Sequence, residues 1–136
     1  MDYGKAIEIA YNNIDKYNEK LTKLRDYYIG EIEKKIPDVK LNGDRKNRLP
    51  GNVNFSFENI QAETLLYKLD EKGICVSSGS ACSSGNSNPS HVLMAIGLPY
   101  ELSKGAIRVT FGESNTKQDV DYLVENLVDI VKALRI

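Results

Sequence analysis

The sequence lacks any long hydrophobic run and any excess of charge of one sign. Its longest apolar stretches span only a few residues, whereas a helix that crosses a membrane needs about 20 apolar residues. The 18 basic and 19 acidic residues leave a formal net charge of −1, and this balance provides no basic surface for a nucleic acid or an anionic lipid. We therefore expect no nucleic acid and no membrane among the partners of this chain.

Cysteine and histidine are scarce as well, with two cysteines and one histidine. Cys75, Cys82 and His91 are too few for a zinc site, which takes about four ligands, and no Cys-x-x-Cys redox motif is present. His91 lies at an expected helix start, where a solvated side chain is more typical than a base for Cys82. The N-terminus lacks the order of a signal peptide, so we expect a cytoplasmic protein with reduced thiols.

The order of periodic segments predicts a single α+β domain over residues 1–136, with a small, mostly antiparallel sheet and helices packed on one face. Residues 1–36 are predicted to form a long helix, because apolar residues recur every three or four positions until Pro37 ends the pattern. The spacing also fits a coiled-coil seam, but the strand-like segments that follow favour packing on a sheet. The stripe consists of Ile7, Ala10, Ile14, Tyr17, Leu21, Leu24 and Tyr28.

Short strands and helices are expected to alternate along the rest of the chain. Alternating apolar residues predict strands near residues 39–41, 53–56 and 107–111. A helix is expected at 62–71, and a short one is opened by Asn88-Pro89 and stops at Gly97. Thr116 is predicted to cap a final helix, because Asp119 follows it at the spacing of a capping box.

Residues 77–88 form a segment that contains no apolar side chain except Ala81 and the thiol of Cys82. Small polar residues cannot bury their backbone in a core, so we expect a mobile surface loop that lets Cys82 reach more than one position. This placement favours Cys82 as a reactive thiol, although a flexible loop with an incidental cysteine has the same composition. By contrast, Cys75 lies in the strand-like run Ile74-Cys75-Val76, where we expect it to pack in the interior.

The loop and its surroundings contain three motifs in register. The first is Ser77-Ser78-Gly79-Ser80-Ala81-Cys82, with Pro89-Ser90 and Ala95-Ile96-Gly97 after it. The second covers residues 49–57 ahead of a helix with Glu63, and the third covers residues 107–112. Together they resemble the NifS/IscS-type cysteine desulfurases, pyridoxal phosphate enzymes of the class V aminotransferase family. The resemblance runs from near Lys5 to the C-terminus.

The resemblance implies a role for two residues. Cys82 resembles the thiol that takes sulfur from the substrate L-cysteine, leaving L-alanine and a persulfide that passes to an acceptor such as an iron–sulfur scaffold protein. Arg108 resembles the arginine that binds the substrate carboxylate, and strand alternation turns it away from Ile107 and Val109, although an exposed surface arginine has the same pattern. The resemblance assigns the active-site loop to Ser77, Ser78, Gly79, Ser80, Ala81, Ser83, Ser84 and Gly85.

One departure from the family concerns the cofactor. The lysine that holds pyridoxal phosphate follows a histidine in these enzymes, but His91 is followed by Val92. We therefore expect the chain to be the C-terminal small domain, with residues 1–36 as the connecting helix, and to lack the large cofactor-binding domain. On this interpretation the chain is inactive without a large domain or homodimer partner. A stand-alone persulfide carrier or regulatory domain, a structural domain in which Cys82 is a passenger, and a selenocysteine lyase-like domain remain alternatives.

Overall fold

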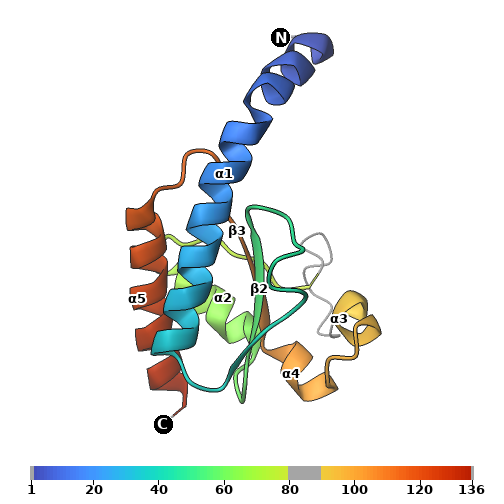
Figure 1. Ribbon diagram of the computed structural model, residues 1–136. Coiled ribbons are helices and arrows are strands. Elements are labelled where there is room, and N and C mark those ends of the chain that lie inside the picture. The colour runs from blue at the N-terminus through green and yellow to red at the C-terminus, as the bar shows by residue number, and fades with distance from the viewer. Residues whose placement is uncertain (1, 80–89, 136) are drawn as a thin grey trace.

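The computed structural model describes residues 2–79 and 90–135 of the 136-residue chain (Figure 1). The secondary-structure elements follow an α-β-β-α-α-α-β-α order. They are α1 (Tyr3–Lys35), β1 (Val39–Leu41), β2 (Asn52–Phe57), α2 (Ala62–Asp70), α3 (His91–Ala95), α4 (Tyr100–Lys104), β3 (Ala106–Thr110) and α5 (Lys117–Leu134).

The three strands form one antiparallel sheet in the order β1-β2-β3. Leu41 of β1 lies opposite Phe55 of β2, and Phe55 lies opposite Ile107 of β3. Because residues directly opposite each other on paired strands project to the same side of the sheet, these three apolar residues share one face. The structure confirms the predicted α+β fold with a small antiparallel sheet.

The apolar face of the sheet is covered by α1, α2 and α5, which pack on it as the sequence predicted (Figure 1). Tyr28 of α1 is fully buried and makes edge-to-face contacts with Phe55 and Phe111, at ring-centroid distances of 6.0 and 5.6 Å. Such pairs stabilise the fold beyond the area that they bury. The aromatic side chains therefore join the long helix to the middle of the sheet.

Helix α1 ends where the sequence predicted, because Pro37 cannot continue a helix. Its apolar stripe, however, divides into two halves. Leu24 and Tyr28 are buried, whereas Ile7 and Ile14 are 53% and 50% exposed, so the expectation that the whole stripe packs on the sheet is wrong. The reason is length: a 33-residue helix is about 50 Å long, whereas a six-residue strand covers about 20 Å.

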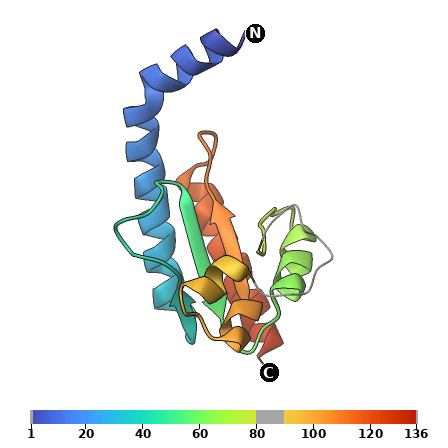
Figure 2. The same cartoon turned by 90° about the vertical axis from the view of Figure 1, so that its right-hand side faces the viewer.

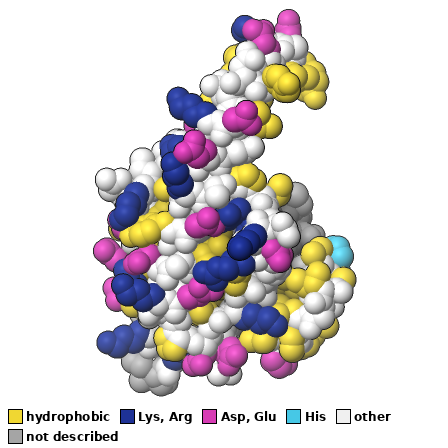
Figure 3. Space-filling model, in the orientation of Figure 1, with side chains coloured by type: hydrophobic (Ala, Val, Ile, Leu, Met, Phe, Trp, Pro, Cys, Tyr) yellow, Lys and Arg dark blue, Asp and Glu magenta, His cyan; other side chains and the backbone are white. Residues whose placement is uncertain are grey.

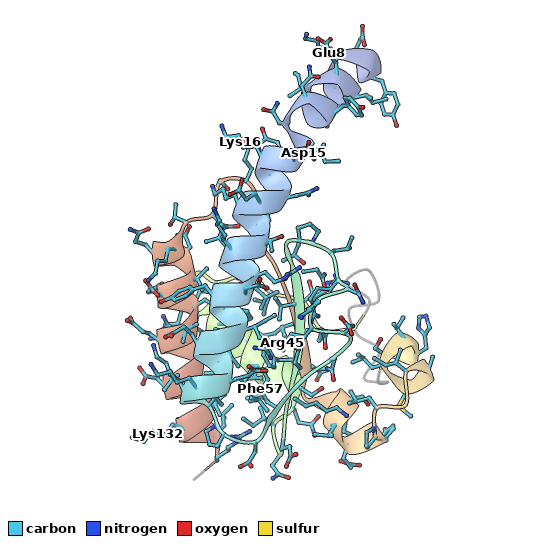
Figure 4. The ribbon with its side chains drawn as sticks, viewed as in Figure 1. Glu8, Asp15, Lys16, Arg45, Phe57 and Lys132 are labelled. Carbon is cyan, nitrogen blue, oxygen red and sulfur yellow. The ribbon has the colours of Figure 1, made fainter. Side chains whose placement is uncertain are left out.

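The first half of α1 projects beyond the rest of the chain and presents apolar side chains at its end (Figures 1 and 3). Polar residues occupy the other sides of this half, as Glu8, Asp15 and Lys16 show in Figure 4. None of the described helices is long and apolar enough to cross a membrane.

Helix α5 begins with the predicted capping box. The Thr116 backbone N–H donates to the Asp119 carboxylate at 2.8 Å, and the Asp119 N–H donates to the Thr116 hydroxyl at 3.4 Å. The sequence pattern predicts a buried stripe of Val120, Leu123, Val124, Leu127, Val128, Val131 and Leu134. The structure buries five of these together with Ile130, whereas Val128 is half-buried and Leu134 is 36% exposed at the end of the helix.

Two local expectations are corrected. Cys75 is exposed, not packed in the interior, because Ile74 and Val76 on either side of it pack on the core and alternation turns the residue between them outward. Ser90 is the N-cap residue of α3, so the expected cap at Asn88 is wrong in position, and Asn88 itself lies outside the described residues. Helix α4 was not predicted; its Leu102 packs with Leu93, Leu98 and Ala106 in a second, smaller apolar cluster.

Candidate active site

The second face of the sheet is polar. Residues of β2 that alternate with the core residues point to it, and the strand register places Asn52 opposite Thr110, Asn54 opposite Arg108, and Ser56 opposite Ala106. Figure 2 looks toward this face, with α1 and α5 behind the sheet and α3 and α4 in front of its lower part. Polar groups of the candidate site therefore lie on a rigid strand pair, on the side opposite the three core helices.

Arg108 lies in the middle of this face. Its side chain is half-buried, and it alternates with the buried Ile107 and Val109 as the sequence predicted. Among the described residues, no carboxylate forms an ion pair with its guanidinium. A half-buried guanidinium without an anion is suited to bind a carboxylate through two parallel hydrogen bonds.

The backbone of Arg108 is paired with Ser77, the first residue of the predicted active-site loop. The Ser77 N–H donates to the Arg108 carbonyl at 3.1 Å, and the Arg108 N–H donates to the Ser77 carbonyl at 2.6 Å. This single bridge continues the sheet beyond β3. The loop therefore begins directly beside the candidate carboxylate-binding arginine.

Side-chain hydrogen bonds join β2 to Asn42, just beyond the end of β1. The Asn42 Nδ2 amide donates to the Asn54 Oδ1 at 2.7 Å and to the Ser56 hydroxyl at 2.8 Å. Asn42 is only 4% exposed, and its Oδ1 accepts no hydrogen bond from the described residues. We name the residues Asn42, Asn54, Arg108 and Ser77 the cross-sheet polar row.

Sequence reasoning assigned no role to Asn42 or Asn54. The alternation of Asn54 with Val53 and Phe55 was the available signal, since it predicts a polar side chain on the face away from the core. Asn42 carried no comparable signal, because it lies just beyond the end of a three-residue strand.

Arginines hold the segment between Asn42 and β2 in place. Arg48 donates to the carbonyls of Asn42 and Asn52 at 3.0 and 3.2 Å, and Arg25 donates to the Leu49 carbonyl at 3.4 Å. Burial, and secondarily the neighbouring Arg25, lowers the pKa of Arg48. Gly51 lets the segment approach β3 closely, because a Cβ there would lie 2.6 Å from the Phe111 carbonyl oxygen.

The candidate nucleophile itself is outside the part of the chain that the structure describes. This nucleophile is Cys82, and its neighbours Ser80, Ala81, Ser83, Ser84 and Gly85 are outside it as well, whereas Ser77, Ser78 and Gly79 are described and half-buried. The one histidine, His91, is exposed at the start of α3. No group of three or more His, Cys, Asp or Glu side chains suited to a metal ion occurs in residues 2–79 and 90–135.

A sequence profile of aminotransferase class-V proteins matches residues 2–123. The chain belongs to the class V aminotransferase family. Within it, the chain is 54% identical over 132 residues to a cysteine desulfurase IscS of Dictyoglomus turgidum, covering 97% of this chain and 34% of that protein. It is 53% identical over 134 residues to a cysteine desulfurase IscS of Clostridium botulinum, with the same coverage.

Solved structures show the same similarity. A NifS-like protein from Rickettsia africae aligns with a TM-score of 0.77 and 30% identity, over 89% of this chain and 31% of that one. A second NifS-like protein aligns with a TM-score of 0.81 and 27% identity, over 94% of this chain and 31% of that one. The chain thus spans about a third of the length of the relatives that it matches.

Pyridoxal phosphate, the cofactor that the family resemblance implies, does not fit the described residues. An amine that bonds covalently to this cofactor has to lose its proton, which burial or a nearby cation promotes. No described lysine is buried. Hydrogen bonds raise the pKa of Lys35, through Glu31, and of Lys117, through Tyr27 and Asp121, which is the opposite direction. The described part of the chain therefore provides no lysine for the cofactor.

Proposed function

We propose that this chain is the small domain of a cysteine desulfurase, with Cys82 as the residue that accepts sulfur from L-cysteine. The observation that carries the proposal is the backbone pairing of Ser77 with Arg108. It attaches the start of the segment containing Cys82 to a strand whose arginine is suited to bind the substrate carboxylate. Cys82 follows Ser77 by five residues, so the chain keeps it within about 18 Å of the Ser77 Cα.

The two residues have separate roles in this proposal. Arg108 binds the carboxylate of L-cysteine and fixes its position relative to the thiol of Cys82. Cys82 reacts as the thiolate, which is the nucleophilic form. A sulfur–sulfur bond on Cys82 replaces the carbon–sulfur bond of the substrate, whose carbon takes a proton to give L-alanine, and the persulfide passes to an acceptor such as an iron–sulfur scaffold protein.

The complete enzyme needs more than this chain. A large domain, as part of the same subunit or of a homodimer, would bind pyridoxal phosphate, which supplies the electron sink for carbon–sulfur cleavage. The 136-residue chain alone is then inactive. We place the reaction in the cytoplasm, where thiols stay reduced.

The test supplies the large domain separately, taken from the part of the Dictyoglomus turgidum relative that this chain does not match. Alanine release from L-cysteine is measured together with the intact mass of the chain. We expect alanine and one added sulfur atom only when both parts are present. Alanine from the 136-residue chain alone would contradict the proposal that its site is incomplete.

Cys75 provides a matched control, because it is an exposed free thiol seven residues before Cys82. We expect Cys82→Ser to abolish both alanine release and the added sulfur, and Cys75→Ser to leave both within about twofold of the unsubstituted chain. Sulfur carried by Cys75, or normal turnover in Cys82→Ser, would exclude Cys82 as the acceptor.

A second candidate is a stand-alone persulfide carrier, which requires the thiol of Cys82 and no cofactor. Its test is uptake of sulfur by the 136-residue chain from a small persulfide donor without any large domain. Uptake on Cys82 that is as fast as in the assembled enzyme would favour the carrier over the desulfurase domain.

A further inference from the structure

Asn54 and Arg108 lie directly opposite each other at the centre of the polar face. The backbone of Arg108 is hydrogen-bonded to Ser77, and the Asn54 carbonyl accepts a hydrogen bond from the Asn42 N–H at 2.9 Å. The backbone groups of the two residues therefore bond to the chain segments on their outer sides and not to each other. Asn54 and Arg108 form a non-hydrogen-bonded antiparallel pair. In such a pair the Cα atoms lie about 4.5 Å apart and the side chains are close neighbours.

The amide of Asn54 has a fixed orientation. Its Oδ1 accepts the hydrogen bond from the Asn42 Nδ2, so its acceptor end faces β1. Its Nδ2 donor is not used in this bond, and the strand order places β3 with Arg108 on the side of β2 away from β1. Asn42 is itself fixed, because it is 4% exposed and its Nδ2 also donates to Ser56.

Two residues with free donors among the described residues thus lie on neighbouring strands of one face. Neither the Asn54 Nδ2 nor the Arg108 guanidinium donates to an acceptor within residues 2–79 and 90–135. The strand register adds Lys40, Asn52 and Thr110 to the same face, and none of these is a carboxylate. Buried or half-buried donors require acceptors, so the face is complementary to an anion.

We propose that Asn54 is a second carboxylate-binding residue, which acts with Arg108 on one substrate carboxylate, and that Asn42 is the positioning residue that orients it. A carboxylate has about four lone-pair sites. It therefore accepts two hydrogen bonds from the guanidinium and a third from the Asn54 amide. This inference deepens the proposed function and rests on it for the identity of the substrate, whereas the anion site itself does not depend on activity.

The first experiment uses the isotopically labelled 136-residue chain and follows the side-chain signals of Asn54 and Arg108 by NMR. Sodium acetate is titrated against sodium chloride at equal ionic strength. We expect saturable shifts of the Asn54 Nδ2 and Arg108 Nε signals with acetate only. Absence of an acetate-specific shift at Asn54 would overturn the inference.

Variants make this test specific. Loss of one hydrogen bond to a charged group weakens binding about tenfold or more, which we expect for acetate in Asn54→Ala. Asn54→Asp keeps the oxygen that Asn42 binds but replaces the donor with a negative charge, so acetate binding should be lost in a chain that still folds. Asn52→Ala is the matched control on the same strand and face, and we expect its affinity to stay within about twofold.

The second experiment uses the chain assembled with the large domain. We expect Asn54→Ala to raise the KM for L-cysteine about tenfold while kcat changes less than about threefold, because the residue binds the substrate without taking part in bond cleavage. An unchanged KM would overturn the inference even with a functional desulfurase. Acetate-specific shifts at Asn54 in a chain whose assembly releases no alanine would instead uphold the anion site and overturn the proposed function.

Discussion

The six residues of β2 alternate between two faces of the sheet, and the two faces have different roles. Val53, Phe55 and Phe57 are at most 1% exposed and pack beneath the core helices. The residues between them belong to the polar face, where hydrogen bonds fix amide and hydroxyl groups in defined orientations. Burial on the first face depends on area and has no direction, whereas recognition on the second face depends on the direction in which each donor points. The alternation of side chains along β2 therefore places the residues that stabilise the fold and the residues that bind on opposite faces of the sheet.

The largest effect should come from the core face. We expect Phe55→Ala to lower the free energy of unfolding by about 3–5 kcal/mol, because it removes a fully buried ring and leaves a cavity. Urea denaturation followed by circular dichroism measures the loss. A loss below about 1 kcal/mol would contradict the conclusion that the core face carries the stability of β2.

A smaller loss of stability is expected when Asn42, a buried residue of the polar face, is replaced. Asn42→Ala removes the donor to Asn54 and Ser56, and leaving buried acceptors unpaired costs about 1–3 kcal/mol. The same variant should weaken acetate binding, since Asn54 loses its orientation. A loss of stability with full acetate affinity would assign Asn42 to the fold alone.

Tyr28 tests the core face with a substitution that should not lower stability. Its hydroxyl is buried without a partner among the described residues, so Tyr28→Phe should be neutral or more stable by about 1 kcal/mol.

Burial raises the pKa of Tyr28 above its ordinary value of 10.0. The native state then keeps a proton that the unfolded state loses, and stability falls as the pH rises above about 10. Urea denaturation at a series of alkaline pH values measures this fall. The free energy of unfolding should fall less steeply with pH in Tyr28→Phe than in the unsubstituted chain, and an equal fall in both chains would contradict the buried environment.

The smallest effect on stability is expected for Arg108→Ala. Its guanidinium contributes no ion pair to the described fold, so the free energy of unfolding should change by about 0.5 kcal/mol or less. Acetate binding and the binding of L-cysteine in the assembled enzyme should both be lost. A loss of stability comparable to that of Asn42→Ala would show that Arg108 is held within the fold and is not available to a substrate.

Local patterns explain which parts of this structure were predictable. Pro37 and the Thr116 capping box act within a few residues, and the alternation in β2 is a property of the strand itself, so each could be read from the sequence. The prediction that Cys75 is buried is wrong because its apolar neighbours Ile74 and Val76 pack on the core, and alternation turns Cys75 to the other side.

The cross-sheet polar row could not be predicted in the same way. Ser77 and Arg108 are far apart in the sequence, and neither residue carries a local signal for their pairing. The bond between Asn42 and Asn54 depends on the register of β1 against β2, which a one-residue shift would destroy. Arg108 was proposed from its motif, but its neighbours follow only from the three-dimensional arrangement.

The bridge between Ser77 and Arg108 also has a consequence for aggregation. β3 is an edge of the sheet, and an edge with free N–H and C=O groups is a template for strands of other chains. In the middle of that edge, Ser77 already bonds to the outward-facing N–H and C=O groups of Arg108. The opposite edge, β1, is only three residues long. Both edges are thereby poor templates, so the same contact that anchors the loop protects the sheet against edge-to-edge association.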